Sequence, residues 1–107
     1  MATGKIRGNH VSAVLDETNQ TYGLATKVIA NNSVVTVFSF GTPTTTASGW
    51  TTVATVPQGY RPIVDIQLAV PNASGQRRIF SVGTDGTVKW YDINGQVFGC
   101  VSYPVNA

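Results

Sequence analysis

The sequence predicts an all-β protein, a small antiparallel β-barrel or sandwich of about seven strands. Its apolar residues are mainly β-branched, with fifteen Val and six Ile against three Leu, and fourteen Thr add to them. These residue types favour strands. Charged residues make up only 11% of the 107 residues. Together with the many β-branched residues, this low share argues against a helical bundle, a coiled coil and a doubly wound α/β fold. The length suits one domain with one core.

The first twenty residues differ from the rest of the chain. Val11, Val14 and Leu15 follow one another with helical spacing behind a possible cap at Ser12, so we expect at most one helical turn there. We therefore expect residues 1–20 to be a neck, a linker or a segment added in front of the domain. The β-barrel head domain would then span residues 21–107.

The first three expected strands are Ala25–Ala30, Val34–Phe40 and Trp50–Val56. Asn31-Asn32-Ser33, a sequence typical of a tight turn, separates the first two. A polar loop over residues 41–49 leads to the third, which a proline ends.

The next segment, Ile63–Val70, alternates between apolar and polar residues, so we expect one face of it to be buried. The residues expected on that face are Val64, Ile66, Leu68 and Val70, with Asp65 and Gln67 on the other. Arg77–Val82 and Thr87–Tyr91 are expected to form a hairpin closed at Asp85-Gly86, a strong hairpin signal. Residues 92–96 form the turn before the last strand, Val97–Tyr103.

Two of these strands carry apolar residues on both faces. On Arg77–Val82, Ile79 and Ser81 should face away from the core. On the last strand, Val97, Val101 and Tyr103 make one face, and Phe98 and Cys100 make the other. Because the chain also has few charges to solvate its outside, this pattern predicts self-association through a symmetric interface.

Net charge and cysteine usage exclude several kinds of partner. The net charge is +2, and among the basic residues only Arg77 and Arg78 are adjacent, so there is no basic stripe for nucleic acid. No apolar run is long enough to insert in a membrane. Residues 1–10 lack the apolar segment of a secretory signal, and Cys100 is the single cysteine. We therefore expect synthesis in a reducing cytoplasm.

The chain is not expected to be an enzyme. His10, the single histidine, lies in the leading segment and has no nucleophile or orienting group that it could pair with. Cys100 lies among valines, as a small buried hydrophobe does. Asp85 and Asp92 lie at opposite ends of one strand, and both are ordinary turn residues. The calcium-loop fragment that begins at Asp92 lacks the bidentate Glu, so we expect neither a metal nor a cofactor.

The residues that best suit a ligand gather on the predicted hairpin. An aromatic face can cover the C–H groups of a sugar, while Asp and Arg bond its hydroxyls, and Arg also suits phosphate. Alternation turns Trp90 inward and Lys89 and Tyr91 outward, which makes Tyr91 the better platform; Trp50 fits either face. The candidate saccharide-binding residues are Tyr91, Asp92, Arg77, Arg78, Ser81 and Trp90.

Four short motifs occur in a fixed order: Gly49-Trp50, Tyr60-Arg61-Pro62, Asp85-Gly86-Thr87-Val88-Lys89-Trp90-Tyr91 and Ser102-Tyr103-Pro104. Over residues 25–105 this set resembles the C-terminal head domains of receptor-binding proteins from siphophages of Gram-positive bacteria, the lactococcal ones especially. The resemblance implies a β-barrel head that forms a homotrimer at the tip of a phage tail or baseplate in the virion. Such heads bind host cell-wall saccharide, often phosphorylated, in grooves near the subunit contacts, and they are made in the cytoplasm of the bacterial host.

The resemblance is weaker at the sugar site. The His and Asp that contact sugar in the lactococcal heads correspond to Ile79 and Ser81, their Trp to Tyr91, and their Arg approximately to Phe98. The resemblance therefore implies the scaffold more strongly than the site: either the ligand differs, or the groove lies nearer to Arg77, Arg78 and Asp92. A structural trimerisation or capping knob without a ligand of its own is the alternative function.

Overall fold

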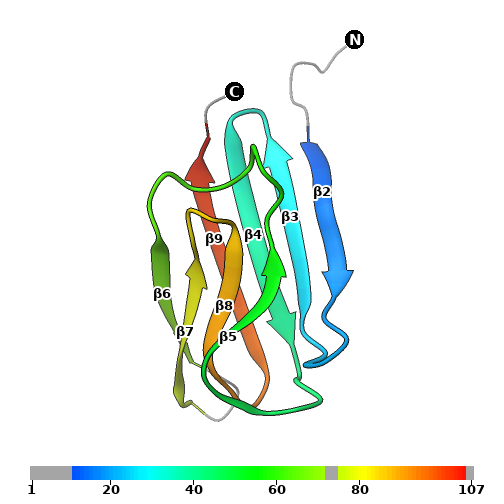
Figure 1. The fold of residues 1–107 in the computed structure, drawn as a ribbon, viewed down its shortest axis with the longest axis vertical. Coiled ribbons are helices and arrows are strands. Elements are labelled where there is room, and N and C mark those ends of the chain that lie inside the picture. The colour runs from blue at the N-terminus through cyan, green and yellow to red at the C-terminus, as the bar shows by residue number, and fades with distance from the viewer. Residues whose placement is uncertain (1–10, 72–74, 106–107) are drawn as a thin grey trace.

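The computed structural model describes residues 11–71 and 75–105. Within these ranges, eight strands form two four-stranded antiparallel sheets, and none of the residues is helical (Figure 1). The first sheet has the order β2-β3-β4-β9 and comprises β2 (Val11–Thr18), β3 (Ala25–Asn31), β4 (Val34–Gly41) and β9 (Val97–Pro104). The second has the order β5-β8-β7-β6 and comprises β5 (Ala47–Thr55), β8 (Thr87–Ile93), β7 (Arg77–Val82) and β6 (Ile66–Pro71). The all-β prediction is confirmed, in the form of two packed sheets.

The core lies between the two sheets, where alternate residues of each strand meet. Trp90 and Phe80 are almost fully buried there, with ring centroids 5.0 Å apart. The indole N–H of Trp90 donates to Ser39 Oγ across the core at 2.8 Å, so two buried polar groups satisfy each other. Gly99 faces these rings, and a Cβ there would lie 2.8 Å from Phe80 and 2.9 Å from Trp90. Each fully buried large side chain stabilises the fold by about 1.5–3 kcal/mol.

Strand β2 corrects the expected boundary at residue 20. Residues 11–18 pair with β3 along their length, and Lys27 Nζ on β3 lies 3.8 Å from Asp16 Oδ2 on β2. A β-bulge between Ala13 and Leu15 interrupts the alternation, so that the adjacent Val14 and Leu15 both pack against the core. Two neighbouring inward residues imitate helical spacing, and for that reason the expected helical turn is wrong. Residues 1–10, including His10, lie outside the described part of the chain.

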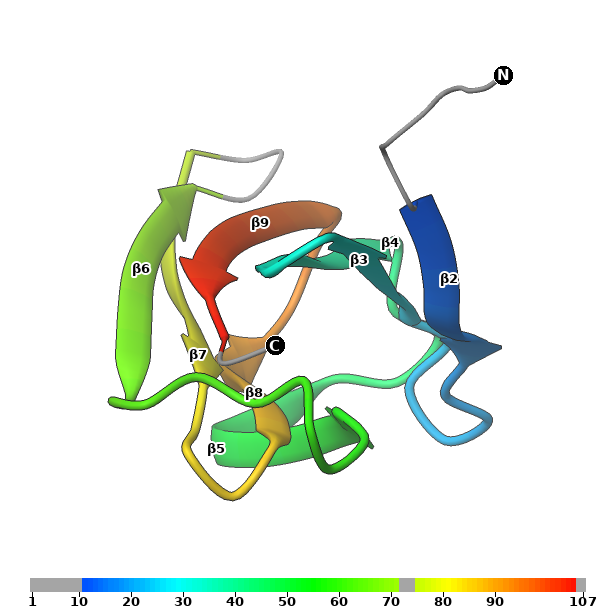
Figure 2. The same ribbon diagram turned by 90° about the horizontal axis from the view of Figure 1, so that it is seen from above.

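Strand β6 is shorter than expected. It begins at Ile66, and the residues Ile63 and Val64 before it are 74% and 61% exposed. Leu68 is opposite the buried Phe80 but remains 40% exposed. The physical reason is position: β6 is an edge strand, beside β9 at one side of the sandwich (Figure 2), so its inner face is only partly covered.

The β7–β8 hairpin forms as predicted from Asp85-Gly86. Gly86 N donates to Gly83 O at 2.9 Å, and Gly86 adopts a φ of +87°, which favours glycine. The expected long loop over residues 41–49 is shorter, because β5 already begins at Ala47.

Direct contacts join the second, third and fourth motifs. Tyr103 donates its hydroxyl to Tyr60 O at 2.6 Å. Arg61 Nε donates to Val56 O at 2.9 Å and lies against Gly86, where a Cβ would come within 2.5 Å of that nitrogen. The segment between β5 and β6 is thereby held against both the hairpin turn and β9. Burial raises the pKa of Tyr103 to about 12, so this hydroxyl remains a donor at neutral pH.

Candidate functional site

Two exposed aromatic side chains lie side by side on the outer face of the second sheet. Trp50 pairs with Tyr91 across β5 and β8, and Tyr91 pairs with Ile79 across β8 and β7. The Trp50 and Tyr91 rings meet edge to face, with centroids 5.2 Å apart, and are 44% and 40% exposed. Tyr91 therefore faces outward as expected, and Trp50, whose face the sequence left open, joins it.

Next to this aromatic pair runs a row of polar residues. Gln67 pairs with Ser81, and Ser81 with Lys89, so neighbouring strands present these side chains side by side. They border a depression of about 300 Å³, which we call the sheet hollow. Its lining includes Trp50, Asp65, Gln67, Ser81, Asp85 and Lys89, with the hairpin turn at one end.

The hairpin turn places two carboxylates at the sheet hollow. Asp65 Oδ1 accepts a hydrogen bond from Thr84 N at 2.8 Å, and Asp85 Oδ1 accepts from Thr87 N at 3.0 Å and from Thr87 Oγ1 at 2.7 Å. The hydrogen bonds from Thr87, and secondarily the charge of Lys89, hold the pKa of Asp85 below its usual value. Asp85 therefore remains a carboxylate throughout the neutral pH range.

Gly83 lies at the centre of these oxygens. A Cβ on Gly83 would be 2.7 Å from Asp85 Oδ1, 3.1 Å from Thr87 Oγ1 and 3.5 Å from Asp65 Oδ1. Because glycine has no side chain, these three oxygen atoms can converge close to its backbone.

Ser81 lies on the outer face as predicted, but its neighbours cover it. It is only 8% exposed and borders the sheet hollow. Among the described residues its hydroxyl has no hydrogen-bond partner. Because Ser81 borders the depression, its hydroxyl can donate a hydrogen bond to a bound molecule or accept one from it.

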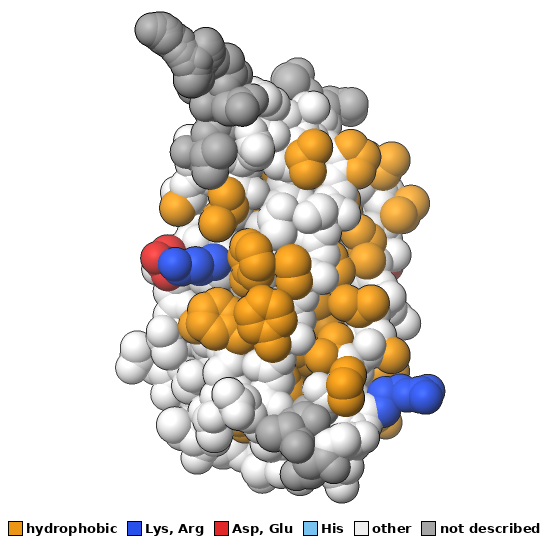
Figure 3. Space-filling view, turned by 180° about the vertical axis from the view of Figure 1, so that it is seen from behind, with side chains coloured by type: hydrophobic (Ala, Val, Ile, Leu, Met, Phe, Trp, Pro, Cys, Tyr) orange, Lys and Arg blue, Asp and Glu red, His pale blue; other side chains and the backbone are white. Residues whose placement is uncertain are grey.

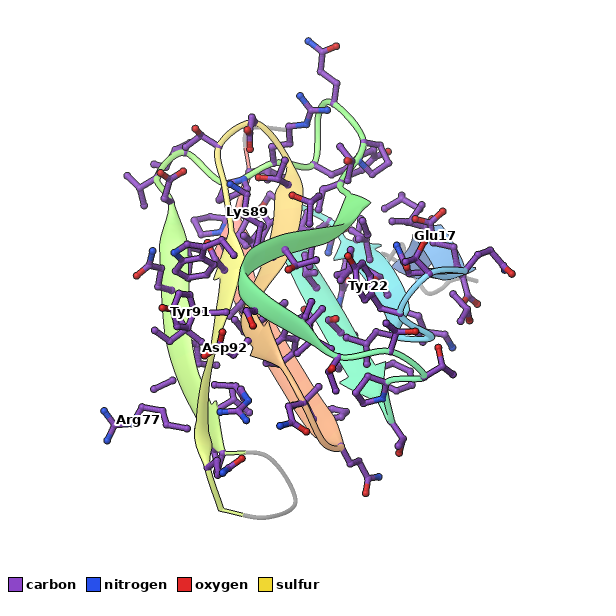
Figure 4. The ribbon with its side chains drawn as sticks, turned by 60° about the horizontal axis from the view of Figure 1, so that its bottom comes forward. Glu17, Tyr22, Arg77, Lys89, Tyr91 and Asp92 are labelled. Atoms are coloured by element: carbon purple, nitrogen blue, oxygen red, sulfur yellow. The ribbon has the colours of Figure 1, made fainter. Side chains whose placement is uncertain are left out.

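The other predicted site residues lie elsewhere. Arg77 is exposed at the far end of β7, opposite Pro71, and points away from Tyr91 and Lys89 (Figure 4). Arg78 and Asp92 border a second depression of about 260 Å³. The guanidinium of Arg78 donates to Arg77 O and to Gln76 Oε1, both at 2.9 Å.

Trp90 is corrected from a binding residue to a structural one. Trp90 is 1% exposed and its N–H is used within the core, so it cannot touch a ligand. Asp92 has a φ of +60°, and its Oδ1 accepts from Gly49 N at 2.7 Å, which secures the bulge where β5 widens before Trp50.

Sequence reasoning missed Asp65 and Gln67 as site residues, although it placed both on the polar face of their segment. The polar face of this segment did not show which residues would lie next to it, because its neighbours depend on the strand order β5-β8-β7-β6, in which β6 lies beside β7. Without that order, nothing in the local pattern associates Gln67 with Ser81.

The outer face of the first sheet has a different character (Figure 3). Phe98 is 58% exposed, and its ring centroid lies 6.2 Å from that of Phe38 and 5.9 Å from that of Phe40. Val34 and the half-buried Cys100 lie on the same side of this sheet. We call these five residues the phenylalanine face.

Within residues 11–71 and 75–105, no three His, Cys, Asp or Glu side chains gather in an arrangement that could hold a metal ion. The same part of the chain contains no helix of the length and hydropathy needed to cross a membrane. The chain matches no family model, and no curated protein is significantly similar to it.

Proposed function

We propose that this chain is a non-enzymatic, lectin-like module that binds a saccharide in the sheet hollow. The observation that carries the proposal is an exposed indole beside a depression bordered by carboxylates, an amide, a hydroxyl and an ammonium group. The flat ring covers the C–H groups of a sugar, and the polar groups bond its hydroxyls. A volume of about 300 Å³ is at the small end of ligand sites and suits one sugar ring.

We further propose that the module is a phage receptor-binding head, located at the tail tip or baseplate of a virion and used for adsorption to a bacterial host. This part rests on the resemblance of its four motifs. Contacts between Tyr103 and Tyr60, between Arg61 and Gly86 and between Trp50 and Tyr91 support it, because they make all four motifs parts of one scaffold. A shallow site binds one sugar weakly, so presentation of several copies on one rigid tip supplies the avidity that adsorption needs.

A homotrimer is the assembly we propose, with the phenylalanine face covered by other copies of the chain. The outward side chains of β4 and β9 carry no charge, so a second copy meets no repulsion there. At about 3.3 Å per residue, the two strands of eight residues extend over about 26 Å. β3 beside them adds Ile29 and also Lys27, which pairs with Asp16 at the margin of this face. An exposed apolar face often marks an interface. Light scattering at several concentrations measures the assembly.

Two substitutions on the second sheet test the binding site. Trp50→Ala should weaken binding to purified Gram-positive cell walls about tenfold or more, a loss of about 1.4 kcal/mol. Arg77→Ala is the matched control, because Arg77 is exposed on the same sheet but lies outside the sheet hollow. Loss of binding in Arg77→Ala with Trp50→Ala unaffected would move the site away from the hollow. Turnover of the wall material by the unmodified chain would contradict the non-enzymatic part of the proposal.

The phenylalanine face favours a second function, a structural trimerisation or capping knob with no ligand. On that alternative the apolar face alone is functional and the sheet hollow is ordinary surface. A glycan array probed with the chain separates the two: a stable trimer that gives no signal at high concentration supports the knob.

A further inference from the structure

The charges at the sheet hollow restrict which saccharide it can take. Asp65 and Asp85 border the hollow against Lys89, so the carboxylates outnumber the cation by one. The two arginines that would suit a phosphate lie outside it: Arg77 borders a depression near Pro71, and Arg78 borders the one near Asp92. A phosphate group carries about 1.5 to 2 negative charges and only acceptor oxygens, and it would be repelled by both carboxylates.

The oxygen atoms that converge at Gly83 have the opposite preference. Oxygens of Asp85, Thr87 and Asp65 lie 2.7, 3.1 and 3.5 Å from the position that a Cβ of residue 83 would take, so they are close to one another at this end of the hollow. Ser81, which is only 8% exposed, borders the same hollow, and its hydroxyl has no hydrogen-bond partner among the described residues. An ammonium group presents three N–H donors and one positive charge, which match a surround of oxygen acceptors.

On this ground we propose that the sheet hollow selects a saccharide with a free amino group over a phosphorylated one, its ammonium lying above Gly83 between Asp65 and Asp85. The proposal rests on the saccharide-binding function and adds the chemical class of the ligand. Trp50, at the edge of the same hollow, covers the apolar side of the sugar ring. The ligand thus differs in charge from the phosphorylated saccharides that the resemblance implies.

Four monosaccharides test this preference by two-dimensional NMR titration of the ¹⁵N-labelled chain: glucosamine, glucose, N-acetylglucosamine and glucose 6-phosphate. At about pH 6 a sugar amine is protonated. We expect glucosamine to shift the amide signals around Ser81 and Gly83 at concentrations at least tenfold lower than glucose does. N-acetylglucosamine should behave like glucose, since its nitrogen is uncharged, and glucose 6-phosphate should bind most weakly.

Two variants locate the preference. Asp65→Asn keeps an acceptor oxygen for Thr84 N but removes the charge, so glucosamine should fall to the level of glucose. Gly83→Ala places a methyl group among the three oxygens, and Gly83 has no left-handed φ that would strain alanine; it should also abolish the preference. Asp16→Asn, an exposed carboxylate on the first sheet that pairs with Lys27, is the control and should retain it.

The outcomes separate this inference from the proposed function. Tighter binding of glucose 6-phosphate than of glucosamine at these amides overturns the amino preference but keeps a saccharide site. A glucosamine preference that persists in both Asp65→Asn and Gly83→Ala overturns it too, because the amine then binds elsewhere. If none of the four sugars, nor a cell-wall preparation, shifts any signal around the hollow, the saccharide-binding function itself fails.

Discussion

The outer faces of the two sheets are built by the same alternation of strand residues, yet they differ in chemistry. On the second sheet, Lys89 and Ser81 stand beside the exposed pair of Trp50 and Tyr91. On the first sheet, the corresponding positions of β4 and β9 carry no charge, and Phe98 is the most exposed aromatic residue of the described chain. A mixed aromatic and polar face suits a polar ligand, whereas an uncharged aromatic face often marks a surface that other protein covers. The comparison teaches that the same alternation can give the two sheets outer faces of different chemistry, so that the proposed ligand site and the proposed assembly surface lie on opposite sides.

The largest effect should come from placing a charge on the phenylalanine face. Phe98→Asp would bury a carboxylate without a partner between copies, so we expect the dissociation constant of the assembly to rise more than 100-fold. Tyr91→Asp is the matched control, an aromatic of similar exposure on the opposite face, and it should leave the assembly intact. Light scattering measures both. If Tyr91→Asp dissociates the copies and Phe98→Asp does not, the two faces have the reverse roles.

Alanine at two glycines should separate folding from binding. Gly99→Ala forces a methyl group to within 2.8 Å of the Phe80 ring in the core, and we expect a loss of about 1–3 kcal/mol in stability from overpacking. Gly83→Ala, on the outer face, should change stability much less while it weakens saccharide binding. Thermal unfolding at one fixed protein concentration compares them. Equal destabilisation by the two substitutions would mean that Gly83 is also structural.

Removing the hydroxyl that joins β9 to the Tyr60 segment should have a smaller effect. Tyr103→Phe deletes the bond to Tyr60 O, and we expect a loss of about 1 kcal/mol. Because burial raises the pKa of Tyr103 from 10.0 to about 12, the unfolded chain releases this proton more readily. The contribution of the protonated Tyr103 to the free energy of unfolding is complete below about pH 10 and is lost as the pH rises through 12. Denaturant unfolding from pH 8 upward should show this decline in the native chain and a shallower one in Tyr103→Phe.

The smallest effect should come from Tyr91→Ala. Tyr91 does not border the sheet hollow, and it supports Trp50 through an edge-to-face contact. Such a pair contributes about 0.5–1.5 kcal/mol, so saccharide affinity should fall by about threefold to tenfold. Binding measurements on Trp50→Ala and Tyr91→Ala should rank Trp50 first. The opposite ranking would make Tyr91 the platform, as alternation alone suggests.

Local pattern predicted much of the fold. The bounds of Arg77–Val82 match the structure, and Ala25–Asn31 differs from its prediction by one residue. Where the pattern failed, a particular feature intervened. The bulge in β2 placed Val14 and Leu15 on the same side, so the alternation typical of a strand was not visible in the sequence. The edge position of β6 left Leu68 exposed despite regular alternation.

The candidate site shows the same division. Alternation on β8 correctly turned Trp90 into the core and Tyr91 outward. It did not reveal that Asp92 adopts a positive φ and accepts a hydrogen bond from Gly49 N, because this contact depends on β5 lying beside β8. The three oxygens around Gly83 likewise come from β8, the hairpin turn and the segment before β6.

The sequence alone determined the residues of most strands, their turns and the side on which most of their residues lie. It could do so because side chains alternate with a period of two residues in any strand, whichever strands lie beside it. The order of the strands depends on contacts between segments far apart in the chain, and no local period encodes it. Only the tertiary structure therefore decided that Trp50 of β5 and Gln67 of β6 lie beside the predicted hairpin that carries Ser81 and Lys89. It also decided that Phe98 meets Phe38 and Phe40 on the other sheet.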